Sequence, residues 1–175
     1  GDVFARPPQG NLISGNNANG VLIQKQSTGN QLSGNFIGTV ASGNAALGNS
    51  LDGVFIHKSD NNTLLGCTFQ QDPFVFYNVI SGNLGNGLRV NNSDDTTIQA
   101  NFFGMGADND TSVGNALNGV VVEGNSTRTV MGGPIPLGNV VAANLQNGIV
   151  VQDKASYFTT YNTFCGLAAF KDDPI

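Results

Sequence analysis

Charged side chains are scarce in this sequence of 175 residues: only 11% are Asp, Glu, Lys or Arg, against about 25% in an average globular domain. The net charge is −5 at neutral pH, so we expect neither a nucleic acid nor an anionic membrane surface as the main partner. No apolar run is long enough to cross a bilayer, and we therefore expect no membrane insertion.

Histidine and cysteine are scarcer still, with one His and two Cys. The sequence has no Cys/His cluster, no Ser-His-Asp spacing and no phosphate-binding loop, so metal-hydrolase, triad and nucleotide-binding functions have no support and no cofactor is expected. Cys67 and Cys165 lie in segments that we interpret as equivalent positions three coils apart in a repeat. That spacing, about 14 Å, is too long for a disulfide, so we predict two free, largely buried thiols.

Asparagine and glycine dominate what is present, with 24 of each. Many belong to a motif that occurs five times: a small residue and Asn, two further residues, Asn or Asp with Gly, and an apolar-x-apolar triplet. The second glycines of the motif are Gly20, Gly53, Gly87, Gly119 and Gly148. Their spacings of 33, 34, 32 and 29 residues define an internal repeat, and a period of roughly 20–50 residues is typical of a solenoid.

Each triplet favours a short β-strand, because its residues are mostly β-branched. Its first and third positions are apolar in every copy, so they should face one shared core while the middle position points outward. The first Asn of each motif then falls in one column, in which each side-chain amide donates to one neighbour and accepts from the next. We predict a structural ladder of Asn16, Asn49, Asn83, Asn115 and Asn144.

The repeat predicts an all-β parallel β-helix of about five coils of 29–34 residues. Each coil should hold three short strands, which in the first coil include residues 45–48 and in the second residues 67–69. One variable loop should leave every coil at the same place. We expect a single domain over residues 1–175, with 1–10 as a lead-in or cap, 11–152 as regular coils and 153–175 as a degenerate last coil or cap.

Three segments carry a resemblance to a known family: 11–16 (Asn-Leu-Ile-Ser-Gly-Asn), 30–38 (Asn-Gln-Leu-Ser-Gly-Asn-Phe-Ile-Gly) and 78–83 (Asn-Val-Ile-Ser-Gly-Asn). The chain resembles the right-handed parallel β-helix repeat family of the pectin-lyase-like superfamily, and especially the Asn/Gly-rich repeats of large bacterial extracellular proteins. The resemblance covers residues 11–152 and implies a right-handed helix in an extracellular or cell-surface protein. The superfamily includes pectate lyases, polygalacturonases, alginate epimerases, phage tailspikes and adhesins, but none of its catalytic motifs carries over.

Two outward columns of the first sheet could hold a site. The middle position of the triplet gives Leu22, Phe55, Arg89, Val121 and Val150, and the residue after the triplet gives Gln24, His57, Asn91, Glu123 and Gln152. His57, Arg89 and Glu123 should lie within reach of one another, with Lys58 at the rim. A lyase or epimerase needs a base and a cation that neutralises the uronate carboxylate, so His57 or Glu123 could be the base and Arg89 the neutraliser. Alternatively, these are ordinary exposed polar residues, helped by one Arg–Glu pair. The apolar residues beside them suggest instead a face that is covered by the tail, a loop or a partner.

Two loops offer further candidates. Phe74, Phe76 and Tyr77 lie in an unusually aromatic stretch, which could stack on sugar rings or pack on the wall of the solenoid. Asp108 and Asp110 form an Asp-x-Asp pair that could bind Ca²⁺, the alternative being a plain solvated loop.

The sequence leaves two functions open. The first is a non-enzymatic β-helix module of a larger extracellular or surface protein, acting as a stalk, adhesin or carbohydrate-contacting scaffold. The second is a polysaccharide lyase, epimerase or hydrolase that acts on an acidic polysaccharide. Since both ends of a solenoid expose unpaired strands, we also expect capping by the termini, continuation into further coils or self-association.

Overall fold

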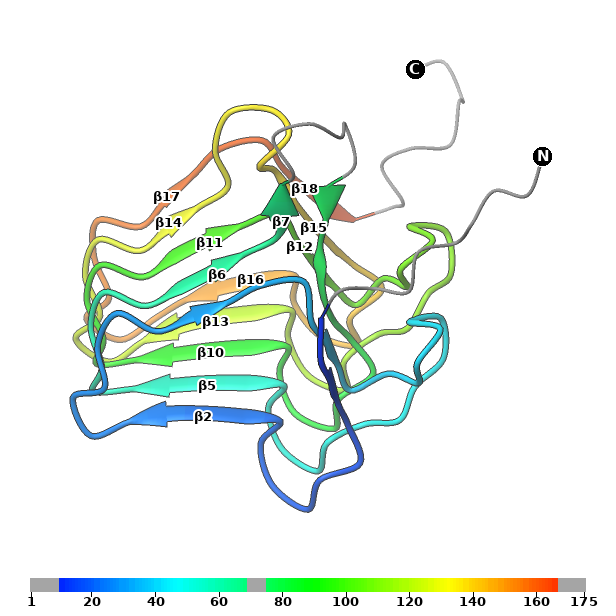
Figure 1. The fold of residues 1–175 in the computed structure, drawn as a ribbon. Coiled ribbons are helices and arrows are strands. Elements are labelled where there is room, and N and C mark those ends of the chain that lie inside the picture. Colours follow the sequence, from blue (N-terminus) through cyan, green and yellow to red (C-terminus); the bar gives the residue numbers. More distant parts are fainter. Residues whose placement is uncertain (1–9, 69–74, 167–175) are drawn as a thin grey trace.

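The computed structural model describes residues 10–68 and 75–166, which wind into a stack of coils whose strands form parallel β-sheets along the stack (Figure 1). In this part of the chain there is no helix, and therefore none long and apolar enough to span a membrane. Each coil contributes one strand to each of three parallel sheets, which we call B, C and A in the order in which the chain passes through them. The predicted parallel β-helix with three strands per coil is confirmed.

The strands of each sheet follow one another along the stack. Sheet B contains β2 (Val21–Gln24), β5 (Val54–His57), β10 (Leu88–Asn91), β13 (Val120–Glu123) and β16 (Ile149–Val151). Sheet C contains β3 (Gln31–Leu32), β6 (Thr63–Leu65), β11 (Thr97–Gln99), β14 (Val130–Met131) and β17 (Thr159–Thr160). Sheet A contains β1 (Leu12–Ile13), β4 (Phe36–Ile37), β9 (Asn78–Ile80), β12 (Asn101–Phe103), β15 (Asn139–Ala142) and β18 (Thr163–Gly166).

The narrow interior between the sheets is filled by the alternate residues that the triplets predict. On sheet B, Val54 pairs in register with Leu88, which pairs with Val120, and all three are fully buried. Ile56 and the equivalent residues of the next two strands form a second buried column. Burying side chains of this size stabilises the fold by about 1.5–3 kcal/mol each, so short strands that could not fold alone hold together as a stack.

The predicted ladder is confirmed at the turn between sheets A and B. The Nδ2 atom of Asn49 donates to the Oδ1 atom of Asn83 over 2.8 Å, and Asn83 donates in the same way to Asn115 over 3.0 Å. Hydrogen bonds of this kind also join Asn16 to Asn49 and Asn115 to Asn144. A further ladder, which we did not predict, occupies the turn between sheets C and A and consists of Asn11, Asn35, Asn78, Asn101 and Asn139.

The prediction that every coil has its loop at the same place is wrong. In the first and third coils a hairpin follows sheet A, closed by antiparallel bridges between Thr39 and Ala46 and between Met105 and Ser112. In the second and fourth coils the insertion precedes sheet A, between β6 and β9 and between β14 and β15. Residues 45–48 therefore form no strand of the stack beyond the bridge at Ala46, and the third strand of the first coil is β4.

The second coil departs from the prediction for the same reason. Residues 67 and 68 form β7 (Cys67–Thr68), which pairs with β8 (Val75–Phe76) in an antiparallel ribbon outside the stack. Cys165 instead lies in sheet A beside Val141, so the two cysteines do not occupy equivalent positions. Cys165 is free but exposed, which corrects its predicted burial: the neighbouring Val141 is covered by a further strand, whereas β18 is the last of its sheet.

Candidate functional site

The outer face of sheet B carries the polar residues that the sequence singled out. Phe55 pairs with Arg89, and Arg89 with Val121, so the first predicted outward column forms as expected. The second column also forms, because Asn91 lies between His57 and Glu123 in the paired strands. Lys58 follows β5 directly, at an exposed turn with a φ of 49°.

Glu123 is the centre of this face. Its Oε1 atom accepts hydrogen bonds from Nε of Arg89 at 2.6 Å and from Nδ2 of Asn91 at 2.9 Å. Its Oε2 atom accepts one from Nε2 of Gln152 at 2.7 Å. The side chain is only 7% exposed, and its carboxylate is held by two donors on the preceding strand β10 and by one donor in the residue that follows β16.

The environment of Glu123 favours its charged form. Burial raises the pKa of this carboxyl, but the hydrogen bonds from Gln152, Asn91 and Arg89, together with the charge of Arg89, outweigh burial and lower the pKa below its usual range. A general base is most effective when its pKa lies near the working pH. A carboxylate with a lowered pKa and both oxygens already bonded is a poor candidate for that role.

His57 reaches Glu123 only through Asn91. The Nδ1 atom of His57 lies 3.0 Å from the Oδ1 atom of Asn91, which also accepts a hydrogen bond from Asn92. With an acceptor facing Nδ1, the proton of the neutral ring is placed there, and Nε2 is left as the nitrogen that can accept a proton. Phe55 connects the two columns, since its ring lies 5.0 Å below the Arg89 guanidinium and 5.5 Å from the His57 ring.

A polar groove of about 410 Å³ opens beside Glu123 on this face. Apart from Arg89 and Glu123, its polar lining consists of the amides of Asn86, Asn118, Gln146, Asn147 and Gln152. An amide both donates and accepts hydrogen bonds, and each amide in a ladder keeps unused capacity for further partners. Apart from Gln152, which belongs to the second predicted column, these amides were not predicted at the site, although three of them are the second Asn of the repeated motif.

Tyr77, the last residue of the aromatic stretch, lies against the outside of sheet A. The ring of Tyr77 stacks on that of Phe102 at 4.2 Å and 17°, and burial raises the pKa of its phenol. For Tyr77 the observed contact is therefore packing on the wall of the solenoid. Phe74 lies outside the described residues, and for Phe76 the structure describes only its place in β8.

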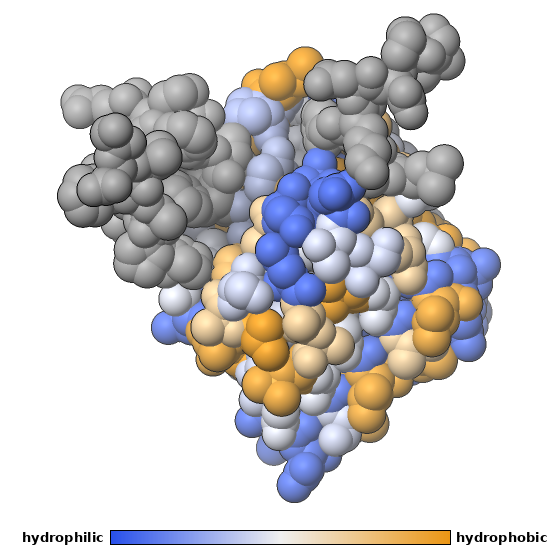
Figure 2. Space-filling view, turned by 90° about the vertical axis from the view of Figure 1, so that its right-hand side faces the viewer, coloured by the Kyte–Doolittle hydropathy of each residue, from blue (hydrophilic) through white to orange (hydrophobic). Residues whose placement is uncertain are grey.

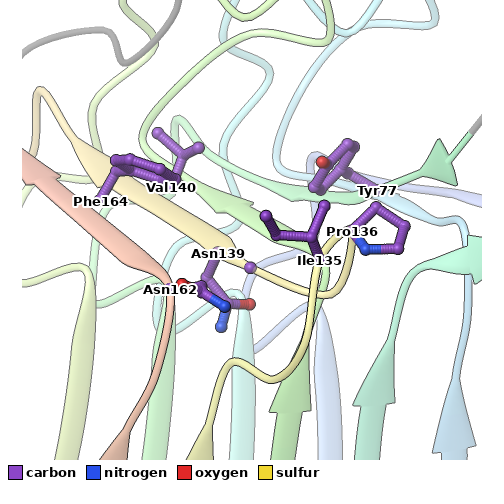
Figure 3. Close-up of a pocket in the computed structure, with 8 residues that line it drawn as sticks. Tyr77, Ile135, Pro136, Asn139, Val140, Asn162 and Phe164 are labelled. Atoms are coloured by element: carbon purple, nitrogen blue, oxygen red, sulfur yellow. The ribbon is translucent and has the colours of Figure 1, made fainter.

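A second cavity, which we did not predict, lies beside Tyr77. It has a volume of about 300 Å³, and Figure 3 shows Ile135 and Pro136 reaching across it from the loop before β15. Val140 and Phe164, on adjacent strands of sheet A, line its other side. On the side of the molecule that carries the hairpins, Figure 2 shows separate apolar areas divided by polar ones.

Asp108 holds the tip of the second hairpin. Its Oδ1 atom accepts hydrogen bonds from the backbone N–H groups of Asp110 and Thr111, and its Oδ2 atom accepts one from the Thr111 hydroxyl. The bonds from the Thr111 hydroxyl and backbone, followed by that from Asp110, lower the pKa of Asp108. Among residues 10–68 and 75–166 no group of three or more His, Cys, Asp or Glu side chains could hold a metal ion.

Comparison with solved structures identifies the fold. The chain is similar to the periplasmic alginate epimerase AlgG, with a TM-score of 0.61 and 20% identity, and to a double mutant and a single mutant of that protein, with TM-scores of 0.64 and 0.62. Each comparison covers 88% of this chain but 32% of the other, so the chain spans about a third of the length of these structures. No family profile and no curated protein matches the chain.

An identity of 20% supports a shared architecture and does not transfer an activity. The contacts within the chain agree with this architecture. Its strands form three parallel sheets, each strand pairs in register with the equivalent strand of the next coil, and asparagines of successive coils are stacked. The chain is therefore a right-handed parallel β-helix that shares its fold with the alginate epimerase AlgG.

Proposed function

We propose that this chain is a non-enzymatic β-helix module of a larger extracellular or cell-surface protein, and that it contacts carbohydrate through the outer face of sheet B. The observation that carries the proposal is the amide-lined groove beside a fully hydrogen-bonded Glu123. Amides that donate and accept suit the hydroxyl groups of a sugar chain. The apolar Val121 and Val150 in the same groove suit its less polar ring faces.

The charges of the groove favour a weakly charged glycan. Arg89 is the only basic side chain among the lining residues, and it is already paired with Glu123. A polyanion would find no unpaired cation there, whereas a neutral glycan requires only the amides. The AlgG structures give independent support at the level of the fold, because an alginate epimerase acts on a polysaccharide.

A binding screen tests this proposal. We expect the chain to bind neutral oligosaccharides in isothermal titration calorimetry, without any change in the sugar. Gln146→Ala should weaken binding about tenfold, equivalent to about 1.4 kcal/mol, because it removes a groove amide that bonds to no other side chain among the described residues. Gln31→Ala, on an exposed position of sheet C, is the matched control and should bind as the wild type does. Equal affinity of both variants, or no binding to any glycan, would refute the proposal.

A second candidate function is an epimerase or lyase that acts on an acidic polysaccharide. It is favoured by the free Nε2 atom of His57 as a base and by the closeness of Arg89, which lies on the next strand. Incubation with alginate and other uronate polymers, followed by NMR of the sugar C5 protons, tests it directly. Turnover by the wild type that His57→Ala abolishes would establish this function instead, and unchanged polymer would exclude it for the substrates used.

A further inference from the structure

The turn between sheets A and B presents an exposed leucine in four successive coils. In each of these turns two residues separate the ladder asparagine from the second Asn or Asp of the motif, and one of the two is a leucine. The four side chains are between 37% and 75% exposed: Leu51, Leu84, Leu117 and Leu145. Turns favour polar residues and glycine, so the local structure of the turn does not account for a leucine in each coil.

Hydrogen bonds between coils fix the backbone of these turns. The N–H group of Leu84 donates to the carbonyl oxygen of Asn49 over 2.9 Å, and that of Leu117 donates to the carbonyl oxygen of Gly85 over 3.1 Å. Equivalent bonds hold the turns of the other two leucines. The four leucines therefore form a fixed line along one corner of the stack, which we call the leucine ridge.

The leucines of the ridge alternate between two columns. In the first of the two middle positions the successive turns carry Ser50, Leu84, Ala116 and Leu145. In the second position they carry Leu51, Gly85, Leu117 and Gln146. In three of the four turns the leucine thus lies beside a small residue. In the last turn the neighbour is Gln146, whose amide lines the groove beside Glu123. Each coil therefore presents one bulky side chain and one hollow, and the two exchange places from one coil to the next.

The ridge is uncharged, and the hairpins do not lie over it. None of the eight residues in the middle positions of these four turns carries a charge. The hairpins lie against the outer face of sheet A instead: Gly43 of the first approaches the ring of Phe36, and Met105 of the second belongs to a buried cluster with Phe102. An exposed apolar surface of this kind is typical of a protein–protein interface.

A second copy of this chain has the surface that matches the ridge. Its coils repeat at the same spacing, about 4.8 Å, so a contact that fits in one coil fits in the next. If two parallel stacks lie side by side, a two-fold axis along the stack exchanges the two columns. Leu84 then faces Gly85 of the second copy, and Leu117 faces its Ala116. Along each column the leucines of the two copies alternate, and each fills a hollow of the other copy.

We propose that two copies of this chain associate side by side through the leucine ridge, with parallel stacks related by a two-fold axis. The same fit recurs in each coil, so it uses neither end of the stack and does not depend on the number of coils. Because one surface serves both copies, the assembly closes as a dimer. The proposal rests on the ridge alone and is independent of carbohydrate binding.

Analytical ultracentrifugation tests the proposal. The average mass of the wild type should rise with concentration from that of one chain to that of two and no further. Leu84→Glu should raise the dissociation constant of the dimer more than about tenfold, because it places a charge among apolar side chains. Ile135→Glu is the matched control and should associate as the wild type does. Ile135 is 87% exposed, but it lies on the loop before β15 and not on the ridge.

A small-to-large substitution distinguishes this interface from unspecific adhesion. Ala116→Leu makes the ridge more apolar, which would strengthen unspecific adhesion. In the proposed dimer it should instead raise the dissociation constant about tenfold, because the new side chain occupies the hollow that receives Leu117 of the second copy. Ala116→Leu/Leu117→Ala, which exchanges the two side chains within one turn, should restore association to that of the wild type.

A disulfide tests the orientation of the two copies. In a Cys67→Ser/Cys165→Ser background, Ser50→Cys should give a disulfide-linked dimer on mild oxidation. Parallel stacks place the two introduced thiols in the same coil on either side of the axis, within the range of a disulfide. Antiparallel stacks that use the whole ridge would separate them by three coils, about 14 Å. A dimer without this cross-link would contradict the parallel arrangement.

Circular dichroism and thermal unfolding provide the folding control, since each variant must match the wild type in both. A wild type that stays monomeric at every concentration would overturn the proposal, and so would a mass beyond that of two chains. The same holds for association that Leu84→Glu leaves unchanged or that Ala116→Leu strengthens.

Discussion

Asn83 and Asn115 lie one coil apart, and the Oδ1 atom of Asn115 accepts two hydrogen bonds from Asn83, one from its backbone N–H at 3.1 Å and one from Nδ2 at 3.0 Å. The Nδ2 atom of Asn83 also lies 3.2 Å from the carbonyl oxygen of Ile37. One buried amide therefore satisfies polar groups on the preceding coil and on the next. This contact links the repeated motif of the sequence to the stacking of the coils.

Asn83→Ala should lower the free energy of unfolding by about 3 kcal/mol, because it leaves buried partners on two coils unsatisfied. Thr96→Val is the matched control. Thr96 is equally buried, but its hydroxyl has no hydrogen-bond partner, so its loss should cost less than about 1 kcal/mol. Urea unfolding followed by circular dichroism measures both values. Similar losses for the two variants would contradict the role given to the ladder.

Asp52→Asn should stabilise the protein by about 1 kcal/mol. Asp52 occupies a column whose other members are the second asparagines of the motif, and its Oδ1 atom accepts from the backbone and side chain of Asn86. In this column each side-chain amide donates to the equivalent residue of the preceding coil, as Asn118 does to Asn86. The carboxylate of Asp52 cannot donate to Asn19 in this way, whereas an amide at the same position can. Thermal unfolding at neutral pH tests the change, and a lower midpoint for the variant would refute the reasoning.

The fold was predictable because its determinants recur. Five copies of one motif at a near-constant spacing fix the strands of sheet B, the inward residues and the ladder through Asn83. The positions of the insertions were not predictable in this way, since Gly-Asn pairs also occur before sheet A, at Gly34 and Asn35, and give no indication of which turn carries the extra residues.

The candidate site was only partly predictable. Residue spacing placed Arg89 beside Glu123, because parallel pairing follows directly from the repeat. It did not indicate that Asn91 separates His57 from Glu123, or that Gln152 completes the carboxylate's hydrogen bonds, since side-chain hydrogen bonding depends on rotamers. The cavity beside Tyr77 depends on the path of the loop that carries Ile135, and a loop of irregular length leaves no periodic signal.

The stability of the protein should depend on the ionisation of Glu123. Its pKa in the folded state is lower than the ordinary value of a glutamate, about 4.5, so the folded state binds the proton more weakly than the unfolded state does. The resulting stabilisation is present above about pH 4.5 and is lost as the pH falls through the folded pKa. Glu123→Gln should be less stable than the wild type at pH 7, and the difference should shrink in acid. A difference that stays constant down to about pH 3 would contradict this linkage.

Cys165 should react with iodoacetamide in the folded protein, because its side chain is exposed. Desolvation by its surroundings raises the pKa of the thiol, so the reaction should be slower than that of a small free thiol at the same pH and should accelerate as the pH rises. Mass spectrometry of the native protein counts the adducts, and Cys165→Ser should remove one of them. An adduct count that this substitution leaves unchanged would show that Cys165 is protected.

The alignment of the asparagines is the central claim, and NMR tests it most directly. With the side-chain amides assigned, a nuclear Overhauser spectrum should contain cross-peaks from the Nδ2 protons of Asn49 to Asn83 and from those of Asn83 to Asn115, because hydrogen-bonded neighbours lie within the range of the method. Cross-peaks along the whole series are the predicted result. Their absence between residues whose own amide signals are sharp and assigned would contradict the stacked fold and the outer face that depends on it.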